Sequence, residues 1–179
     1  MRRIFFLVWI CLCPLLCSSL KAQDLPNYLN PSTWLLGYFE VDRLLDKPHG
    51  DWYNKEFDGY SIDNETFLRL SELDLSKVEV LVVLGTWCPD SRREVPRFIK
   101  LFQLLEMDED GLRMLGTDSY KKAPIDNYDD LNIERVPTFI FYRNKSELGR
   151  IIEYPIESLE KDMLKIFRVI ELSSSGVME

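Results

Sequence analysis

The stretch that decides the fold is VEVLVVLGTWCPDSRREVPRF, which covers residues 78–98. Its first seven residues, 78–84, are nearly all branched and apolar without polar alternation, a pattern that predicts a strand buried on both faces of a sheet. Pro89 fits the first turn of a following helix, where a missing N–H group costs nothing, and Pro96 is expected to kink that helix. The stretch therefore predicts a central strand that passes into a helix, with Cys88 at the junction.

The residues that follow continue the alternation of strands and helices. A second strand is expected around residues 112–115, and a short helix near residues 126–131. Residues 138–142 and 149–153 predict a hairpin, and apolar residues at helical spacing over 156–170 predict a closing helix. This order predicts an α/β fold.

The first residues have the layout of a signal peptide. Two arginines precede an apolar run over residues 4–16, and small or polar residues follow it up to Ala22; the run is too short and wrongly flanked for a membrane span. We expect cleavage after Ala22, or after Ser19, and an exported, periplasmic protein; a core strand is the alternative interpretation of the run. A lipid anchor on Cys17 is a further alternative, because PLLCSS loosely resembles a bacterial lipobox, although Leu16 stands where that motif has a small residue.

Composition and cysteine count limit the function. The chain has 179 residues, of which 46% are hydrophobic and 29% charged, enough for one core of ordinary size with an extension. Removing residues 1–22 takes away three of the 22 basic residues and none of the 30 acidic ones, which leaves a net charge of about −11. Such a surface repels nucleic acid and anionic lipid. Nucleic acid is therefore not an expected partner, and a membrane is expected only if Cys17 is lipidated.

The same removal leaves Cys88 as the sole cysteine of the four in the chain. An exported protein with one cysteine has no internal disulfide, so Cys88 is either a reactive thiol or an inert one. His49 is the only histidine, and no cysteine lies near it in the sequence, so no metal site is expected.

Four parts of the chain are expected: a signal peptide at 1–22, an aromatic-rich helical extension at 23–75, the α/β domain at 76–172 and a frayed tail at 173–179. The aromatic residues of the extension are expected to pack on the core, because so many are unfavourable in water. A substrate-binding lid is the alternative interpretation of this segment.

Two helices are expected in the extension. Ser32 is a suitable cap for a helix that runs to about Leu45, and Asp63 or Asn64 for another that runs to about Leu73.

Several positions in and around the opening stretch resemble the thioredoxin family. They are the Trp-Cys pair, a serine where the family has its second cysteine, the kinking proline and the loop of the family's cis-proline: Trp87, Cys88, Ser91, Pro96 and Val136-Pro137-Thr138. The resemblance covers about residues 78–170 and implies a thioredoxin fold, a central mixed β-sheet flanked by helices, here with a mostly helical N-terminal extension. The segments TWCPDSRREVPRF, RVPTFIFYRN and ELGRIIEYP are similar to a branch of exported bacterial thioredoxin-like proteins with a Cys-x-Asp-Ser motif.

Two departures from the family pattern affect one step of its chemistry. Ser91 replaces the second cysteine, and Val82 stands where the family often buries an acid that shuttles protons to it. The resemblance therefore implies a monothiol thiol–disulfide oxidoreductase or isomerase, in which Cys88 attacks a disulfide and an external thiol resolves the mixed disulfide. The implied partners are protein or small-molecule thiols and disulfides together with an external thiol reductant, and no cofactor is expected.

Residues next to the thiol are expected to tune it. A cysteine at a helix N-terminus faces unpaired N–H groups and the positive end of the helix dipole, which favour the thiolate of Cys88. Ser91, one turn later, is expected to donate its hydroxyl proton to the sulfur. Arg92 and Arg93 are expected to stabilise the anion further, whereas Asp90 opposes it.

The resemblance also implies substrate-binding residues that flank the sulfur, namely Trp87, Pro89, Val136 and Pro137. In the alternative interpretation Cys88 is a small core residue, since free cysteine is commonly buried, and the chain is a redox-inactive binding module for a protein client. Arg92 and Arg93 are then a solvated helix face, and Pro137 an ordinary trans proline.

Two further classes of protein fit less well. The Cys-x-x-Ser spacing is that of monothiol glutaredoxins, which bind an iron–sulfur cluster with glutathione, but the export signal and the residues Trp87, Pro89 and Asp90 disfavour this class. A peroxiredoxin is disfavoured because its Pro-x-x-x-Thr-x-x-Cys motif is absent, with Gly85 where the threonine should be.

Overall fold

A mixed sheet of five strands forms the centre of the computed structural model, which describes residues 27–168 and 170. The strands, in the order in which they lie side by side, are β1 (Gly37–Phe39), β3 (Leu112–Gly116), β2 (Val78–Leu84), β4 (Thr138–Arg143) and β5 (Ser146–Ile152). Strand β2 is central, parallel to β3 and antiparallel to β4, while β1 and β5 form the two edges by antiparallel pairing. The sheet therefore contains the central strand and the hairpin that the sequence predicts.

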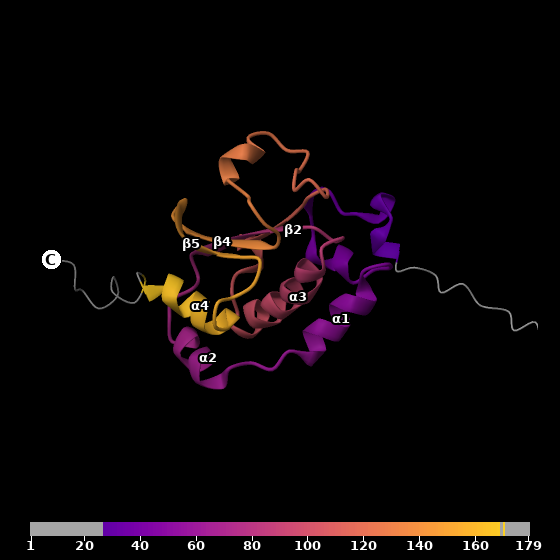
Figure 1. Cartoon of the computed structure of the whole chain (residues 1–179). Coiled ribbons are helices and arrows are strands. Elements are labelled where there is room, and N and C mark those ends of the chain that lie inside the picture. The colour runs from indigo at the N-terminus through magenta and orange to yellow at the C-terminus, as the bar shows by residue number, and fades with distance from the viewer. Residues whose placement is uncertain (1–26, 169, 171–179) are drawn as a thin grey trace, which may run out of the picture.

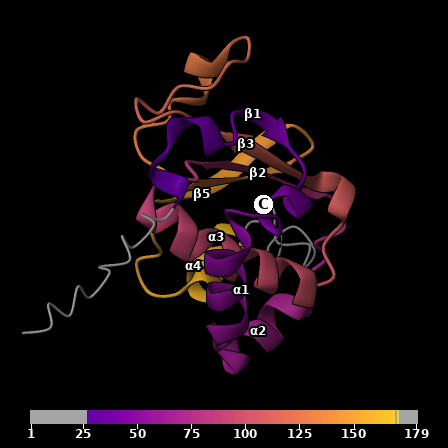
Figure 2. The same ribbon diagram turned by 90° about the vertical axis from the view of Figure 1, so that its right-hand side faces the viewer.

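The α-helices of the described residues lie on one side of this sheet, as Figures 1 and 2 show. They are α1 (Gly50–Gly59), α2 (Asn64–Ser71), α3 (Pro89–Leu104) and α4 (Leu159–Ile166). Short 3-10 turns occur at η1 (Asn27–Leu29), η2 (Pro31–Thr33), η3 (Val41–Leu44), η4 (Glu109–Gly111) and η5 (Tyr128–Leu131). Helix α3 follows β2 directly and carries Pro96 in its interior.

The opposite side of the sheet is covered by the segment of residues 117–137, drawn in orange at the top of Figure 1. The short helix expected near residues 126–131 is only the 3-10 turn η5. Asn127 and Asn132 flank this turn with φ values of 55° and 51°. These left-handed conformations stop a helix at both ends, which is why the turn is short.

Successive residues of β2 point to opposite sides of the sheet, so the strand contributes side chains to two apolar cores. Val80 and Val82 pack against the helices in the larger core, whose fully buried aromatic side chains are Phe98, Phe102, Phe139, Phe141 and Phe167. Leu81 and Val83 point the other way, into a smaller core that also contains Cys88. The alternation explains why β2 needs apolar residues at nearly every position.

The expected helix from Ser32 to Leu45 is wrong. These residues instead form η2, the edge strand β1 and η3. Asn30 caps η2 by accepting a hydrogen bond from the N–H of Ser32 at 3.1 Å, and Gly37 then has φ +74°, which is incompatible with a helix. The extension is therefore less helical than expected and contributes a strand to the central sheet.

The rest of the extension is helical and packs on the core. Asp63 caps α2 by accepting a hydrogen bond from the N–H of Thr66 at 3.5 Å. Helix α1, which the sequence analysis did not predict, packs against α3.

Some expectations concern residues outside the described part of the chain. They are the signal peptide at 1–22, the lipid on Cys17 and the frayed tail at 173–179. Within residues 27–168 and 170, none of the helices has the length and apolarity needed to cross a membrane.

Candidate active site

Cys88 lies at the junction between the central strand and helix α3, as the N-cap residue of that helix. Its N–H donates to the carbonyl oxygen of Gly85 at 2.8 Å, and its own carbonyl accepts the first helical hydrogen bond from Arg92 at 3.0 Å. These bonds fix the turn that presents the thiol. The cysteine is free, and only 7% of it is exposed.

The sulfur contacts the loop before β4. Cys88 Sγ donates a hydrogen bond to the carbonyl oxygen of Val136 at 3.2 Å, and the Val136–Pro137 peptide bond is cis. A thiol is a weak hydrogen-bond donor. The carbonyl oxygen would repel a thiolate at the same position, which opposes the effect of the helix end.

Ser91 is fully buried but supports the turn rather than the sulfur. Its Oγ accepts a hydrogen bond from the N–H of Gly85 at 3.2 Å, and the structure, as far as it is described, has no hydrogen bond between this hydroxyl and Cys88. The expected donation from Ser91 to the sulfur is therefore not seen. The N–H of Gly85 is buried, and a buried N–H group requires an acceptor.

Asp90 and Arg93, both expected to tune the thiol, neutralise each other. Arg93 forms ion pairs with Asp90 at 2.7 Å and with Glu94 at 2.6 Å. The hydrogen bond to Glu94, followed by that to Asp90, raises the pKa of Arg93. Arg93 is thus paired with carboxylates of its own helix. Because its charge offsets that of Asp90, Asp90 opposes a thiolate at Cys88 less than the sequence suggests.

Arg92, in contrast, folds back over the turn that carries Cys88. Its Nη1 donates to the carbonyl oxygens of Trp87 at 2.8 Å and Thr86 at 3.4 Å. The guanidinium carbon lies 3.6 Å from the centre of the Tyr28 ring. Burial lowers the pKa of Arg92, while the nearby Tyr28 and Cys88 raise it. Of the two arginines, Arg92 is the one that lies close to the thiol.

Trp87 is half-buried and fixed by two contacts. Its indole N–H donates to the carbonyl oxygen of Thr117 at 2.9 Å, and its ring centre lies 6.1 Å from that of Trp34. Gly85 makes room for the ring, because a Cβ there would lie 2.5 Å from it. Pro89 is exposed beside Cys88.

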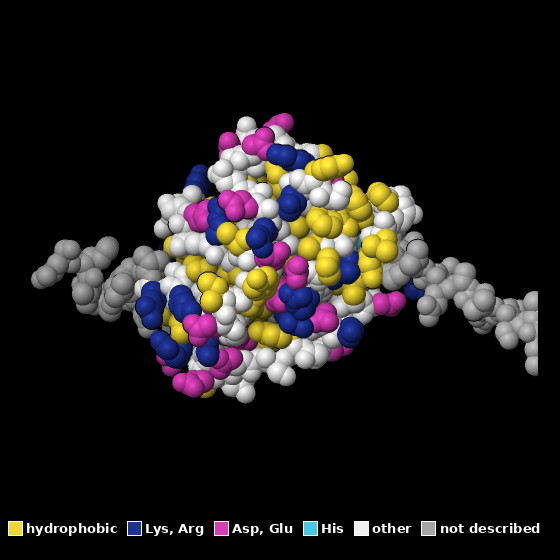
Figure 3. Space-filling view, in the orientation of Figure 1, with side chains coloured by type: hydrophobic (Ala, Val, Ile, Leu, Met, Phe, Trp, Pro, Cys, Tyr) yellow, Lys and Arg dark blue, Asp and Glu magenta, His cyan; other side chains and the backbone are white. Residues whose placement is uncertain are grey.

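Sequence reasoning missed the residues that the extension brings to this site. Tyr28 and Trp34 contact Arg92 and Trp87 from far away in the sequence. In the sequence, only the many aromatic residues of the extension indicated that this segment makes such contacts. On the space-filling surface, apolar side chains gather on the right half of the face in Figure 3, the side where Figure 1 shows the N-terminal segment.

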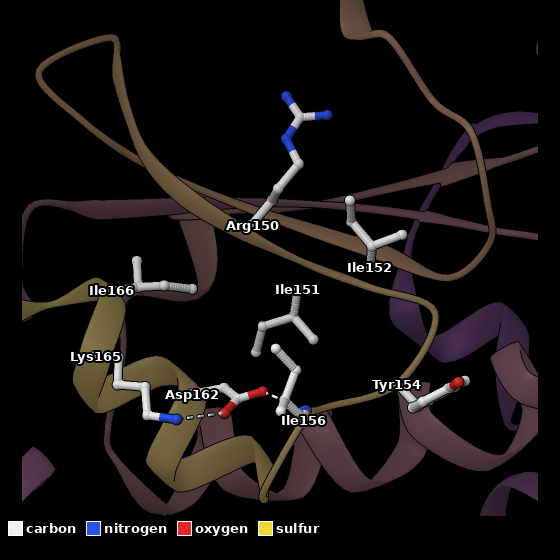
Figure 4. Close-up of a pocket in the computed structure, with 8 residues that line it drawn as sticks. All are labelled: Arg150, Ile151, Ile152, Tyr154, Ile156, Asp162, Lys165 and Ile166. Atoms are coloured by element: carbon white, nitrogen blue, oxygen red, sulfur yellow. Dashed lines mark hydrogen bonds and ion pairs between the residues drawn. The ribbon is translucent and has the colours of Figure 1, made fainter.

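A separate hollow of about 300 Å³ lies between β5 and α4 (Figure 4). It is lined by Arg150, Ile151, Ile152, Tyr154, Ile156, Asp162, Lys165 and Ile166. Asp162 accepts a hydrogen bond from the N–H of Ile156 at 2.6 Å and pairs with Lys165 at 3.5 Å. No cysteine or histidine lines this hollow, so it does not form part of the thiol site.

The described residues contain no group of three or more histidine, cysteine or carboxylate side chains arranged to hold an ion. His49 is buried, and its Nδ1 has no hydrogen-bond partner there.

Comparison with known proteins identifies a family. The sequence profile of the family described as Thioredoxin matches residues 51–165. No match was found among curated proteins.

Solved structures resemble the chain at low identity. A protein of unknown function from Pseudomonas aeruginosa is 17% identical over 67% of this chain and 72% of its own, with a TM-score of 0.43. The germline-specific thioredoxin Deadhead of Drosophila melanogaster is 18% identical over 60% of this chain and 92% of its own, with a TM-score of 0.37. Mitochondrial thioredoxin 3 of Saccharomyces cerevisiae, in its oxidised form, is 18% identical over 65% of this chain and 97% of its own, with a TM-score of 0.36.

The profile match covers more than half of the chain, from α1 to the end of α4, and includes the whole junction around Cys88. It confirms the resemblance to the thioredoxin family and, with the mixed five-stranded sheet and its helices, the fold expected from it. The chain belongs to the thioredoxin family.

Proposed function

We propose that the chain is an exported monothiol thiol–disulfide oxidoreductase or isomerase whose nucleophile is Cys88. The observation that carries this proposal is a free cysteine at the N-cap of α3, in contact with the Val136–Pro137 loop. Ser91 occupies the position of the family's second cysteine, so the proposed reaction uses a single thiol of the protein, that of Cys88.

The proposed reaction has two exchange steps. The Cys88 thiolate attacks one sulfur of a client disulfide; a new S–S bond forms, the client S–S bond breaks, and the second client sulfur leaves as a thiolate. An external thiolate, or a second thiol of the client, then attacks the client sulfur of the mixed disulfide. Cys88 leaves as a thiolate and the client carries the new bond, so the protein itself is neither oxidised nor reduced over the cycle.

Neighbouring groups have distinct parts in these steps. The end of α3 and Arg92 favour the thiolate, both when it attacks and when it leaves. Trp87, Pro89, Val136 and Pro137 surround the sulfur and are the proposed contacts of the client. A client backbone N–H that bonds to the carbonyl oxygen of Val136 would offset part of the negative charge on that oxygen and so weaken its repulsion of a thiolate at Cys88.

The second candidate function is a redox-inactive binding module for a protein client. It is favoured by the 7% exposure of Cys88 and by the hydrogen bond that holds its proton. A thiol kept protonated and covered is not a nucleophile.

Reaction of the folded mature protein, residues 23–179, with oxidised glutathione at pH 7 decides between the two. We expect a mixed disulfide in the intact mass, its loss on adding excess thiol, and slow insulin reduction unless that external thiol is abundant. Cys88→Ser is the control and should form no adduct. If the wild-type thiol reacts only after denaturation, the oxidoreductase proposal is wrong and the binding module replaces it.

Export is part of the same proposal and rests on the first 22 residues of the sequence. N-terminal sequencing of the protein from a bacterial periplasm should find Gln23. Leu20 would only move the cleavage site, whereas an acylated Cys17 would replace a soluble protein by a membrane-anchored one.

A further inference from the structure

Arg92 differs from the other charged residues at the start of α3, because no carboxylate of the described residues pairs with it. Asp90 and Glu94 pair with Arg93, and Glu94 also lies 3.6 Å from Arg97. Arg92 forms no ion pair with any residue in the described ranges, 27–168 and 170. The first turns of α3 therefore place one uncompensated positive charge near Cys88.

Tyr28 covers one face of this charge. With the guanidinium carbon 3.6 Å from its ring centre, the stacking is as close as van der Waals contact permits. Nη1 is held from another direction by the carbonyl oxygens of Trp87 and Thr86. Nε and Nη2 make no hydrogen bond within the described part of the protein, which leaves the three N–H groups of these two nitrogens for an anion.

The position of Tyr28 is itself fixed by the segment that leads into the edge strand β1. Its carbonyl oxygen accepts the indole N–H of Trp34 at 2.9 Å, and the Trp34 ring packs on Trp87. The next residue, Leu35, donates its N–H to Thr86 Oγ1 at 3.3 Å. Residues 28–35 thus join the turn that carries the thiol at several points rather than lying loosely over it.

We propose that Tyr28 is a positioning residue of the thiol site, which holds Arg92 as a fixed cation and so makes the site prefer small anionic thiols and disulfides. This inference rests on the proposed function and specifies its substrate class. The preference opposes the charge of the whole protein, about −11 without residues 1–22, which repels anions. A local, immobile guanidinium with unused donors attracts a carboxylate next to the reacting sulfur.

The test compares an anionic with a cationic disulfide. Rates of mixed-disulfide formation at Cys88 are measured with oxidised glutathione and with cystamine at low ionic strength, and their ratio is taken for each variant. In each reaction one S–S bond to Cys88 forms, the S–S bond of the reagent breaks and one small thiolate leaves. A ratio of two rates in the same protein cancels a difference in protein concentration between variants.

We expect Tyr28→Leu to shift the ratio toward cystamine by about threefold, the size of a partly exposed charge interaction. Tyr28→Phe keeps the stacking ring and should retain the wild-type ratio. Tyr38→Leu is the matched control, because Tyr38 is on the same segment but lies 6.0 Å from a different arginine, Arg113. Salt at 0.5 M should reduce the differences.

Two results would overturn the inference. An unchanged ratio in Tyr28→Leu, with both reagents still reacting, removes the role of Tyr28. If that variant does not fold, Arg92→Gln takes its place, and an unchanged ratio there removes the charge preference itself. Failure of the wild-type thiol to react with either reagent is a different outcome, because it refutes the proposed oxidoreductase function on which the inference rests.

Discussion

Glu160 provides the sharpest test of how the extension is attached to the core. This glutamate, in the first turn of α4, is fully buried. It accepts hydrogen bonds from Tyr60 Oη at 3.1 and 3.0 Å and from the N–H of Asp63 at 3.2 Å. Burial, followed by the neighbouring Glu160 charge, raises the pKa of Tyr60, so its hydroxyl remains a donor at neutral pH. One carboxylate thus joins the connection between α1 and α2 to the last helix.

Removing either partner should destabilise the fold. Tyr60→Phe deletes a hydrogen bond to a charged group, which is expected to cost about 1.5 kcal/mol, the lower end of the usual range because Tyr60 is only partly buried. Glu160→Ala leaves two donors without an acceptor and is expected to cost about 2 kcal/mol, since the desolvation of the charge is relieved at the same time. The two costs should not add, with a coupling of about 1 kcal/mol in a double-mutant cycle.

Urea unfolding, followed by tryptophan fluorescence, measures these free energies from the midpoint and slope of the transition. Glu157→Ala is the matched control, because Glu157 precedes α4 but is half exposed and pairs only with lysines; its midpoint should equal that of the wild type. If Glu160→Ala behaves like this control, or if the two costs are simply additive, the buried carboxylate does not hold the extension.

The remaining predictions concern pH, packing and redox chemistry. Burial lowers the pKa of His49 below its ordinary 6.5, so on acidification the unfolded chain binds a proton at His49 before the folded protein does. The contribution of His49 to stability is therefore complete above pH 6.5 and is lost as the pH falls toward the pKa of the folded state. In urea unfolding, a His49→Gln variant should lose less stability than the wild type between pH 7.5 and 5.5. A Cβ at Gly116 would lie 2.0 Å from the carbonyl oxygen of Leu35, so Gly116→Ala should lower the free energy of unfolding by about 1–3 kcal/mol. The same variant should be cleaved faster by protease within residues 28–36, and an unchanged cleavage rate would contradict that close approach. Ser91→Cys should form a reversible disulfide with Cys88, visible as the loss of two free thiols on mild oxidation, and should increase insulin reduction; persistence of both thiols would show that the two sulfurs cannot meet.

Much of the fold follows from local patterns. Strand β2 and helix α3 are adjacent, and each has a strong period of its own, so the switch from one to the other is visible in the sequence. Strand β1 is different, because it has three residues and pairs with β3, whose partners lie more than seventy positions later. Ser32 is a recognisable helix cap, whereas nothing in the sequence of residues 37–39 indicates a strand. Only the pairing of β1 with β3 in the folded protein makes this segment a strand.

The residues of the thiol site can be divided in the same way, into those that a local motif identifies and those that only the folded structure brings together. Cys88 and Pro137 were identified because a motif fixes their place in the fold. The hydrogen-bond partner of Ser91 was not identified, because only the folded structure shows that its hydroxyl lies against the buried N–H of Gly85, which requires an acceptor. The contact between Tyr28 and Arg92 spans 64 positions and leaves no local pattern.

The lone thiol gives the charge on Arg92 a second role in the proposed reaction. With a second cysteine at position 91, the client would be expelled while Cys88 stayed in a disulfide, so Cys88 would attack but would not have to leave in that step. With Ser91, every cycle ends with Cys88 as the leaving group, and a sulfur leaves faster when its anion is stabilised. The carbonyl oxygen of Val136 works against that anion at 3.2 Å, whereas Arg92 and the end of α3 work for it. A fixed cation beside the sulfur therefore assists both attack and release, and its loss should slow the return of free Cys88 from a mixed disulfide as well as its formation.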